Sequence, residues 1–138
     1  MLQRFSSDSG MEQALAYSRA VDDGRYIFLA GTTGMNYTNG TLAEAATDQL
    51  AQCFENIEAA LAAFGAAYGD IVRVRYVFTS RADFERCRSM IHARFDAVRP
   101  AATLIIAELL DPKMKLEIEV MARSHLDQSL DSTKALSQ

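Results

Sequence analysis

Two glutamates stand two residues apart in the segment KLEIEVMA at residues 115–122. Polar and aliphatic residues alternate through this segment. A β-strand sends successive side chains to opposite faces, so Glu117 and Glu119 share one face of a predicted strand. A carboxylate in a partly desolvated site has a raised pKa and can exchange protons with a water molecule, which makes Glu117 the candidate catalytic residue. The alternative is structural: Glu117 pairs across the sheet with Arg73 or Arg75, which alternate in the same way. Glu119 is interpreted as structural.

The other reactive residues point to packing rather than to a metal, a cofactor or a nucleophile. His92 and His125 have no Asp, Cys or Glu partner at metal-ligand spacing. No Ser-His-Asp order, P-loop or dinucleotide motif is present. Cys53 and Cys87 fall on the apolar stripes of two predicted helices, where a free cysteine behaves as a small hydrophobe. We therefore expect two reduced core thiols, no metal site and no cofactor.

The elements that must position these residues follow the order β-β-α-β-α-β-β. Asp-Asp-Gly at 22–24 is typical of a hairpin turn. Thr41 with Glu44, and Ser80 with Asp83, have the spacing of capping boxes and predict two helix starts. The predicted elements are a hairpin over 17–31, a loop over 31–41, helices over 41–65 and 80–95, and strands over 70–80, 101–110 and 114–122. This order predicts an α+β fold with one sheet and both helices on one face.

Length and composition place the chain among ordinary globular proteins. It has 138 residues, of which 49% are apolar and 23% charged, with a formal net charge of -4. This predicts a single domain over 1–138, with a core at about 15–123 and a polar tail at 124–138. The acidic balance argues against nucleic acid as a partner. The start has no apolar run like that of a secretory signal, and no stretch is long enough to cross a membrane, so a cytoplasmic protein is expected.

Two of the predicted strands are apolar on both faces. In the strand over 101–110, Leu104 and Ile106 share one side, and Ile105 and Leu109 share the other. The segment YIFLA at 26–30 has the same property. Strands that are buried on both faces lose their polar alternation. Two helices cover only one face of a sheet, so the second face is expected to lie against another copy of the chain.

The order of elements and several segments resemble the RidA/YjgF family of reactive-intermediate deaminases. The resemblance covers about residues 17–122 and is carried by YSRAVDDGRYIFLAGTTG, by FENIEAALAAFGAAYGDIVRVRYVFTSRADFERCRSMIHARF and by RPAATLIIAELLDPKMKLEIEVMA. It implies a chorismate-mutase-like fold and a homotrimer with a small-molecule cleft between neighbouring subunits. It also implies the cofactor-free hydrolysis of enamines and imines to a keto acid and ammonia.

The resemblance transfers the family's site residue by residue. The last-strand glutamate matches Glu117, the cleft tyrosine matches Tyr17 and the cleft glycine matches Gly31, with Thr32 beside it. Backbone groups at Ala102 and Thr103 border the same cleft in the family. Ala102 stands where the family has the arginine that binds the substrate carboxylate, and alanine cannot form that bidentate clamp. Arg88 replaces a frequent asparagine, and Arg88 or Arg99 is a candidate to supply the missing charge.

Three functions remain open from the sequence. The first is hydrolysis of an enamine, imine or related C=N substrate other than the usual 2-aminoacrylate type, since the carboxylate clamp is missing. In this reaction Glu117 would deprotonate the water, and backbone N–H groups near Ala102 and Thr103 would polarise the substrate. The second is a trimer that binds a metabolite or a protein without catalysis. The third is a ribonuclease or translation inhibitor, a label used in this family that the acidic composition does not favour.

Overall fold

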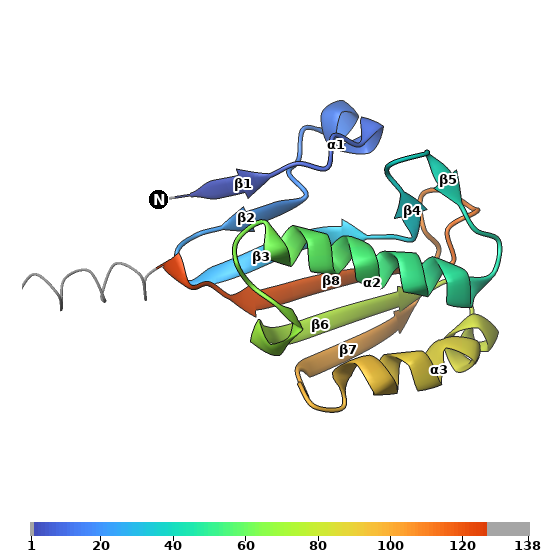
Figure 1. Ribbon diagram of the computed structural model, residues 1–138. Helices are drawn as coiled ribbons and strands as arrows, with labels where there is room; N and C mark the ends of the chain where they lie inside the picture. Colours follow the sequence, from blue (N-terminus) through green and yellow to red (C-terminus); the bar gives the residue numbers. More distant parts are fainter. Residues whose placement is uncertain (1, 127–138) are drawn as a thin grey trace, which may run out of the picture.

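The computed structural model describes residues 2–126, and its long elements follow the predicted order (Figure 1). Short elements accompany them near the N-terminus, between the second and third of these elements, and between the third and fourth. The long elements are β2 (Ala20–Asp22) with β3 (Tyr26–Thr32), α2 (Ala46–Ala62), β6 (Ile71–Phe78), α3 (Arg81–Phe95), β7 (Ala101–Ile106) and β8 (Leu116–Arg123). The short ones are β1 (Gln3–Phe5), α1 (Gly10–Leu15), β4 (Met35–Asn36), β5 (Thr41–Leu42) and the 3-10 turn η1 (Tyr68–Asp70).

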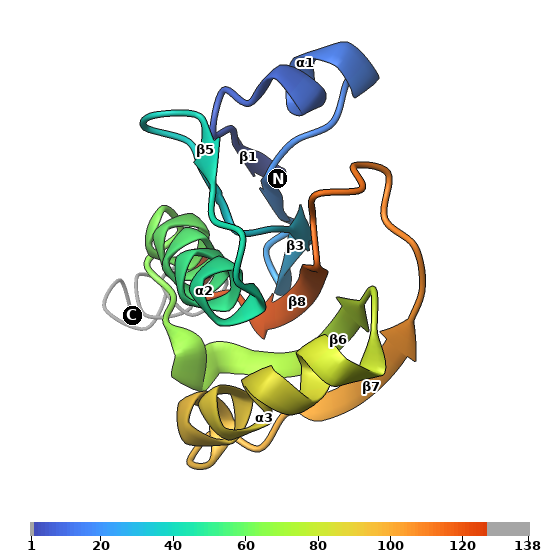
Figure 2. The same cartoon turned by 90° about the vertical axis from the view of Figure 1, so that its right-hand side faces the viewer.

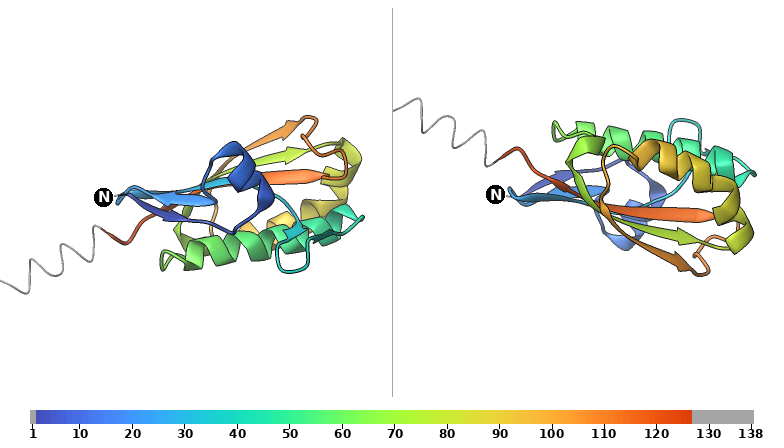
Figure 3. Two further views of the ribbon diagram at one scale, coloured as in Figure 1. Left: turned by 90° about the horizontal axis from the view of Figure 1, so that it is seen from above. Right: turned by 90° about the horizontal axis from the view of Figure 1, so that it is seen from below.

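Six of the strands form one sheet in the order β1-β2-β3-β8-β6-β7. All neighbours are antiparallel except β6 and β7, which run parallel. Both long helices lie on the same side of this sheet, as the two views of Figure 3 show. α2 packs on β3 and β8, and α3 packs on β6. The predicted fold class, an α+β sheet with its helices on one face, is therefore confirmed.

The core lies between the sheet and the two helices. β8 sends Leu116, Ile118, Val120 and Ala122 into it, which is the alternation that the sequence predicts. β6 contributes Val74, Tyr76 and Phe78. A register shift between Ile71 and Arg73 places Ile71 in the core. Helix α2 adds a stripe that includes Leu50, Cys53, Phe54, Ile57 and Leu61. Cys53 and Cys87 are both buried free thiols, as predicted.

No helix covers the opposite face of the sheet in the part of the chain that the structure describes. On this face, the side chains of Phe28 on β3 and Ile105 on β7 remain 40% and 38% exposed. The acids of β8 also face this side: Glu119 lies opposite Arg75 of β6 and makes an ion pair with it at 3.7 Å. The face is thus mixed, with apolar side chains around a charged pair, rather than wholly apolar.

Local signals predicted one helix start correctly and one wrongly. Ser80 caps α3, and its hydroxyl accepts a hydrogen bond from the backbone N–H of Asp83. α2, however, begins at Ala46 without a side-chain cap. Thr41, the predicted cap, lies in β5 opposite Asn36 of β4 and hydrogen-bonds to Asn39. The segment predicted as a loop over 31–41 therefore contains a small hairpin, whose pairing competes with the cap.

Residues 127–138 of the predicted polar tail lie outside the described residues. No helix between residues 2 and 126 is long and apolar enough to cross a membrane.

Candidate functional site

A cavity of about 820 Å³ lies at one end of β8. Segments far apart in sequence gather around it: α1 with the residues before it, the segment between α1 and β2, the end of β3, the β4–β5 hairpin, and the loop between β7 and β8 (Figure 2). Much of its wall is apolar, from Met11, Leu15, Met35, Leu110 and Met114. Binding sites for small molecules have this size and this mostly apolar lining, with a few polar groups.

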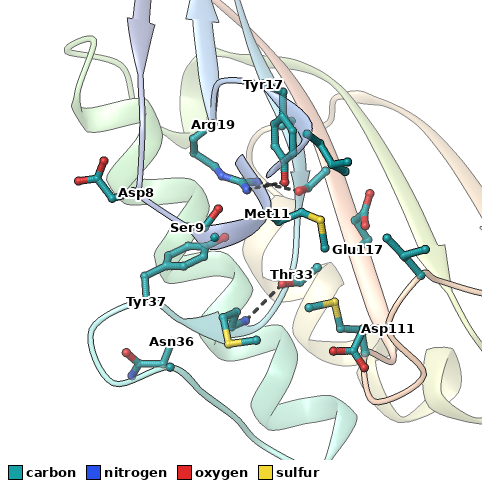
Figure 4. Close-up of a pocket in the computed structure, with 18 residues that line it drawn as sticks. Asp8, Ser9, Met11, Tyr17, Arg19, Thr33, Asn36, Tyr37, Asp111 and Glu117 are labelled. Carbon is teal, nitrogen blue, oxygen red and sulfur yellow. Dashed lines mark hydrogen bonds between the residues drawn. The ribbon is translucent and has the colours of Figure 1, made fainter. Parts of the chain in front are cut away.

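Glu117 projects into this cavity from β8 (Figure 4). It lies opposite Val77 in the sheet, so it has no arginine as its cross-strand neighbour. Arg75 instead pairs with Glu119. Glu117 makes no ion pair with any residue in the described part of the chain. The pairing alternative raised by the sequence therefore applies to Glu119 and not to Glu117.

The surroundings of Glu117 raise the pKa of its carboxyl above the ordinary value. Burial is the largest cause, because a desolvated carboxylate loses hydration. Repulsion from Glu119 raises the pKa further, while the nearby charge of Arg19 lowers it in part. A half-buried carboxyl with a raised pKa that faces an open cavity can act as a general base or acid toward a bound water.

The missing side chain of Gly31 leaves room for the carboxylate of Glu117. A register shift interrupts the pairing of β3 with β8 between Leu29 and Thr32, and Gly31 lies within it. A Cβ added to Gly31 would overlap the carboxylate of Glu117. Glycine is therefore required here for close approach of a side chain to the backbone.

Arg19 is a buried member of the site that the sequence analysis did not single out. Its guanidinium donates to the carbonyl of Gly31 at 2.7 Å and to the hydroxyl of Tyr17 at 3.5 Å. It also lies 5.7 Å from the ring centres of Tyr17 and Tyr37. Its side chain is 4% exposed, and Glu12 of α1 is within 3.5 Å of it.

The sequence carries a local signal for the helix that holds Glu12, but none for its contact with Arg19. Ser9 and Glu12 have the capping-box spacing, and Ser9 does cap α1 by accepting the backbone N–H of Glu12. Arg19 interrupts an otherwise strand-like run, YSRAV, at 17–21. No spacing rule links the two residues, because their contact depends on how the chain turns back between the end of α1 and Arg19.

Not all the predicted site residues line the cavity of this single chain. Tyr17, Gly31 and Glu117 do, and buried Thr32 lies directly beside Gly31. Ala102 and Thr103 lie on β7, and Thr103 accepts a hydrogen bond from Arg73. β6 stands between β7 and β8, so these two residues are two strand spacings, about 10 Å, from the line of Glu117.

The two arginines considered as replacements for the missing clamp also lie elsewhere. Arg88 is exposed on α3, where it pairs with Glu85 and lies over the ring of Phe84. Arg99 pairs with Asp96 just beyond the same helix. Neither reaches the cavity wall of its own chain.

Two amides of α2 hold the cavity wall in place. Gln49 is fully buried; it donates to the carbonyls of Ala43 and Lys113 and accepts the backbone N–H of Lys115. It thereby fixes the loop that carries Leu110 and Met114. Asn56 donates to the carbonyls of Thr33 and Met35 and so holds the other side of the cavity.

Within residues 2–126, no group of three or more His, Cys, Asp or Glu side chains is arranged to hold a metal ion. The chemistry that the described site itself offers is proton transfer at Glu117, beside an apolar cavity and a fixed guanidinium.

Comparison with protein families gives one match that spans most of the chain. The family model described as Endoribonuclease L-PSP matches residues 9–124.

Curated relatives share about 30% of the sequence. A RutC family protein of Aquifex aeolicus is 30% identical over 108 residues, which cover 77% of this chain and 86% of the relative. A 2-iminobutanoate/2-iminopropanoate deaminase of Dermatophagoides farinae is 31% identical over 104 residues, which cover 75% of this chain and 81% of the relative. A protein of the same name from Salmonella typhimurium is 29% identical over 109 residues, which cover 77% of this chain and 85% of the relative.

Solved structures share the fold. A member of the YjgF family from Mycobacterium tuberculosis superposes with a TM-score of 0.80 at 30% identity, covering 89% of this chain and 99% of that one. Yeast Mmf1 superposes with a TM-score of 0.78 at 19% identity, covering 90% and 99%. The second likeness concerns the fold alone.

Proposed function

Because the chain belongs to the endoribonuclease L-PSP family, the RidA/YjgF family that its sequence resembles, we propose that it hydrolyses, without a cofactor, the C=N bond of an imine or of the imine tautomer of an enamine. Some relatives carry the name of imine deaminases, which supports this class of reaction. The observation that carries the proposal is Glu117, a half-buried carboxyl of raised pKa that lines the cavity and is held against Gly31.

The reaction follows from that placement. Glu117 in its carboxylate form accepts a proton from a water molecule as the water oxygen bonds to the imine carbon, giving a carbinolamine. The protonated carboxyl then returns the proton to the nitrogen. The carboxylate next takes the hydroxyl proton of the carbinolamine and passes it to the nitrogen as the C–N bond breaks, so that the carbonyl forms and ammonia leaves. Positioning and a matched pKa are what the protein contributes to such proton transfers, typically about 10²–10⁴-fold in rate for the acid–base group.

The proposal includes a homotrimer with a cleft at each subunit interface. Its support is the sheet face that no helix covers, together with the family. β7 is an edge strand whose outer backbone groups have no partner strand within the described residues. In the trimer, β7 of a neighbouring copy would face the cleft, and backbone N–H groups near Ala102 and Thr103 would polarise the substrate.

The substrate is proposed to differ from 2-aminoacrylate and related imino acids. Ala102 replaces the arginine that the family uses for the substrate carboxylate, and alanine offers no donor. Activity on imino acids should therefore be far below that of an arginine-bearing relative. Equal rates for the two proteins would contradict this part of the proposal.

Substitution of Glu117 by Gln tests the catalytic role. The amide keeps the shape of the side chain and cannot accept the water proton, so kcat should fall by about 10²–10⁴-fold while the fold and the oligomer persist. Carbonyl product release from imines generated in situ provides the readout, and circular dichroism with light scattering checks the fold.

The alternative is a trimer that binds a metabolite or protein and has no turnover to lose. Unchanged product release in the Glu117→Gln variant, at the uncatalysed rate for both proteins, would favour that binder. RNA binding that weakens steeply with salt would instead support the ribonuclease activity named in the family description.

A further inference from the structure

Arg19 is the only cationic side chain among the described residues that line the cavity. It is fixed by its hydrogen bond to Gly31 and by the hydroxyl of Tyr17 (Figure 4). In a family whose usual substrate clamp is an arginine, this residue would be the natural replacement for the one missing at position 102. Its own neighbour determines whether it can serve in that way.

That neighbour is Glu12, which is buried beside the guanidinium at 3.5 Å. Its carboxylate accepts hydrogen bonds from the hydroxyls of Ser6, Ser7 and Ser9 and from the backbone N–H of Ser7. Burial raises the pKa of Glu12, but these hydrogen bonds and Arg19 outweigh it and lower the pKa to about 2. Glu12 is therefore a permanent negative charge at neutral pH, and it balances the positive charge of Arg19.

The remaining charges of the cavity wall are negative. Asp8, Asp111 and Glu117 line it, and no further Lys or Arg of the described chain does. A carboxylate entering the cavity would meet these acids and find the one guanidinium already neutralised. A neutral or protonated imine would meet no such repulsion, and its body would rest on the flexible methionines of the wall.

Glu12 balances the positive charge of Arg19, but one hydrogen-bond donor of the guanidinium group has no acceptor. Its Nε–H is buried and has no acceptor among the described residues. The ion pair with Glu12 is long, at 3.5 Å, and much of the carboxylate's capacity is taken by the serines. Removal of the Glu12 charge would leave the Arg19 guanidinium uncompensated, with a free N–H donor in the cavity wall. Such a group would bind an anion.

We propose that Glu12 sets the substrate class of this cleft, which accepts imines that carry an apolar body and no carboxylate. This inference rests on the proposed function and deepens it. The reaction is the hydrolysis of R₂C=NH₂⁺ by water to R₂C=O and NH₄⁺, with Glu117 carrying the two protons of the water to the nitrogen, one after the other. Glu12 does not touch the substrate in this scheme. It determines specificity by cancelling the charge that a carboxylate would need.

The test compares two imines that differ in the carboxylate. One is formed from phenylalanine by an amino-acid oxidase, and the other from 2-phenylethylamine by a flavin-dependent amine oxidase, which releases the free imine. Semicarbazide converts the free imine to a semicarbazone faster than it condenses with the carbonyl product, so the enzyme's rate is read as the decrease in the initial rate of semicarbazone formation. The wild-type protein should prefer the carboxylate-free imine by at least about tenfold in kcat/KM.

The Glu12→Gln variant should reverse this preference in part, raising kcat/KM for the phenylalanine-derived imine by about tenfold or more. Glu44→Gln is the matched control, because it removes the same charge from an exposed residue outside the cavity and should leave the ratio unchanged. A wild-type preference for the carboxylate-bearing imine would overturn the inference and leave the hydrolase intact. If the wild-type protein did prefer the carboxylate-bearing imine and an Arg88→Ala variant lost that preference, Arg88 would be identified as the clamp.

A binding measurement keeps the inference testable if Glu12→Gln does not fold or if neither imine is hydrolysed. Calorimetry of the wild-type protein with 2-phenylethylammonium and with 3-phenylpropanoate should show binding of the cation at least about tenfold tighter. Tighter binding of the anion, or binding of neither compound, would overturn the inference. Absence of turnover with selective cation binding would contradict the proposed hydrolase alone.

Discussion

At the scale of single residues, the site depends on close approach more than on residue type. Glu117 and Glu119 are chemically identical and share one face of β8. The cross-strand neighbour separates them: Arg75 neutralises Glu119, while Glu117 lies opposite Val77 and reaches the cavity. Gly31 completes the distinction, because only a residue without a Cβ leaves room for the carboxylate.

Gly31→Ala should displace Glu117 without dismantling the sheet. The new methyl group would overlap the carboxylate, which must rotate or shift, and a displacement of about 1 Å in a catalytic group can lower the rate by about 10²-fold. The imine hydrolysis assay measures the loss, and thermal unfolding reports any general damage. Gly69→Ala is the control, since a Cβ there meets no atom within 4 Å. Full activity in Gly31→Ala would show that the close contact is dispensable.

The raised pKa of Glu117 should appear in the pH dependence of kcat. A base works only when deprotonated, so activity should fall as the pH drops through a pKa above the ordinary 4.5 of glutamate. Repulsion from Glu119 contributes to this shift, so Glu119→Gln should move the acidic limb to lower pH. Glu55→Gln, an exposed change on α2, should not. An acidic limb that stays in place in Glu119→Gln would contradict the assigned cause.

At the scale of elements, the cavity is built by loops that α2 holds from behind. Gln49 bonds both to the segment before α2 and to the loop between β7 and β8. Asn56 does the same for the turn after β3. A helix that the sequence presents only as a core stripe therefore also sets the shape of the site.

Gln49→Leu should lower both stability and activity. It leaves the carbonyls of Ala43 and Lys113 and the N–H of Lys115 without their partner, and a buried unsatisfied polar group costs about 1–3 kcal/mol. The loop with Leu110 and Met114 should also lose its position, which reduces kcat/KM. Urea unfolding and the imine assay measure the two effects. Glu55→Leu on the exposed face of the same helix is the control, and equal losses there would refute the specific role of Gln49.

At the scale of the whole molecule, the open face of the sheet governs assembly. It combines exposed apolar residues such as Phe28 and Ile105 with the Arg75–Glu119 pair. Such a mixture is typical of protein interfaces, which have an apolar centre and paired polar groups. The sequence predicted a partner for this face from strands that are apolar on both sides, and the structure leaves that face without a covering helix.

The protein should sediment as a trimer at micromolar concentration, and Phe28→Lys should shift it toward smaller species. A lysine at this position would place an unpaired charge on the sheet face that is proposed to form the interface. Leu2→Lys is the control, because Leu2 is 53% exposed and precedes the edge strand β1. Sedimentation velocity distinguishes the outcomes. A wild-type monomer would refute the assembly and, with it, a cleft shared between subunits.

The sequence by itself determined the order of the long elements, the core stripes and the face of β8 that carries the acids. These features follow from period and local chemistry: alternation in strands, recurrence every three or four residues in helices, and the Ser80 cap. The same local logic failed at Thr41, where pairing of β5 with β4 competes with the cap.

Only the tertiary structure decided which glutamate is free, which arginine enters the cavity and what neutralises it. Each answer depends on contacts between different elements: β6 beside β8, Gly31 against Glu117, and the turn after α1 that brings Arg19 to Glu12. Sheet register and loop packing set these distances, and neither is encoded in the spacing of residues along a single element.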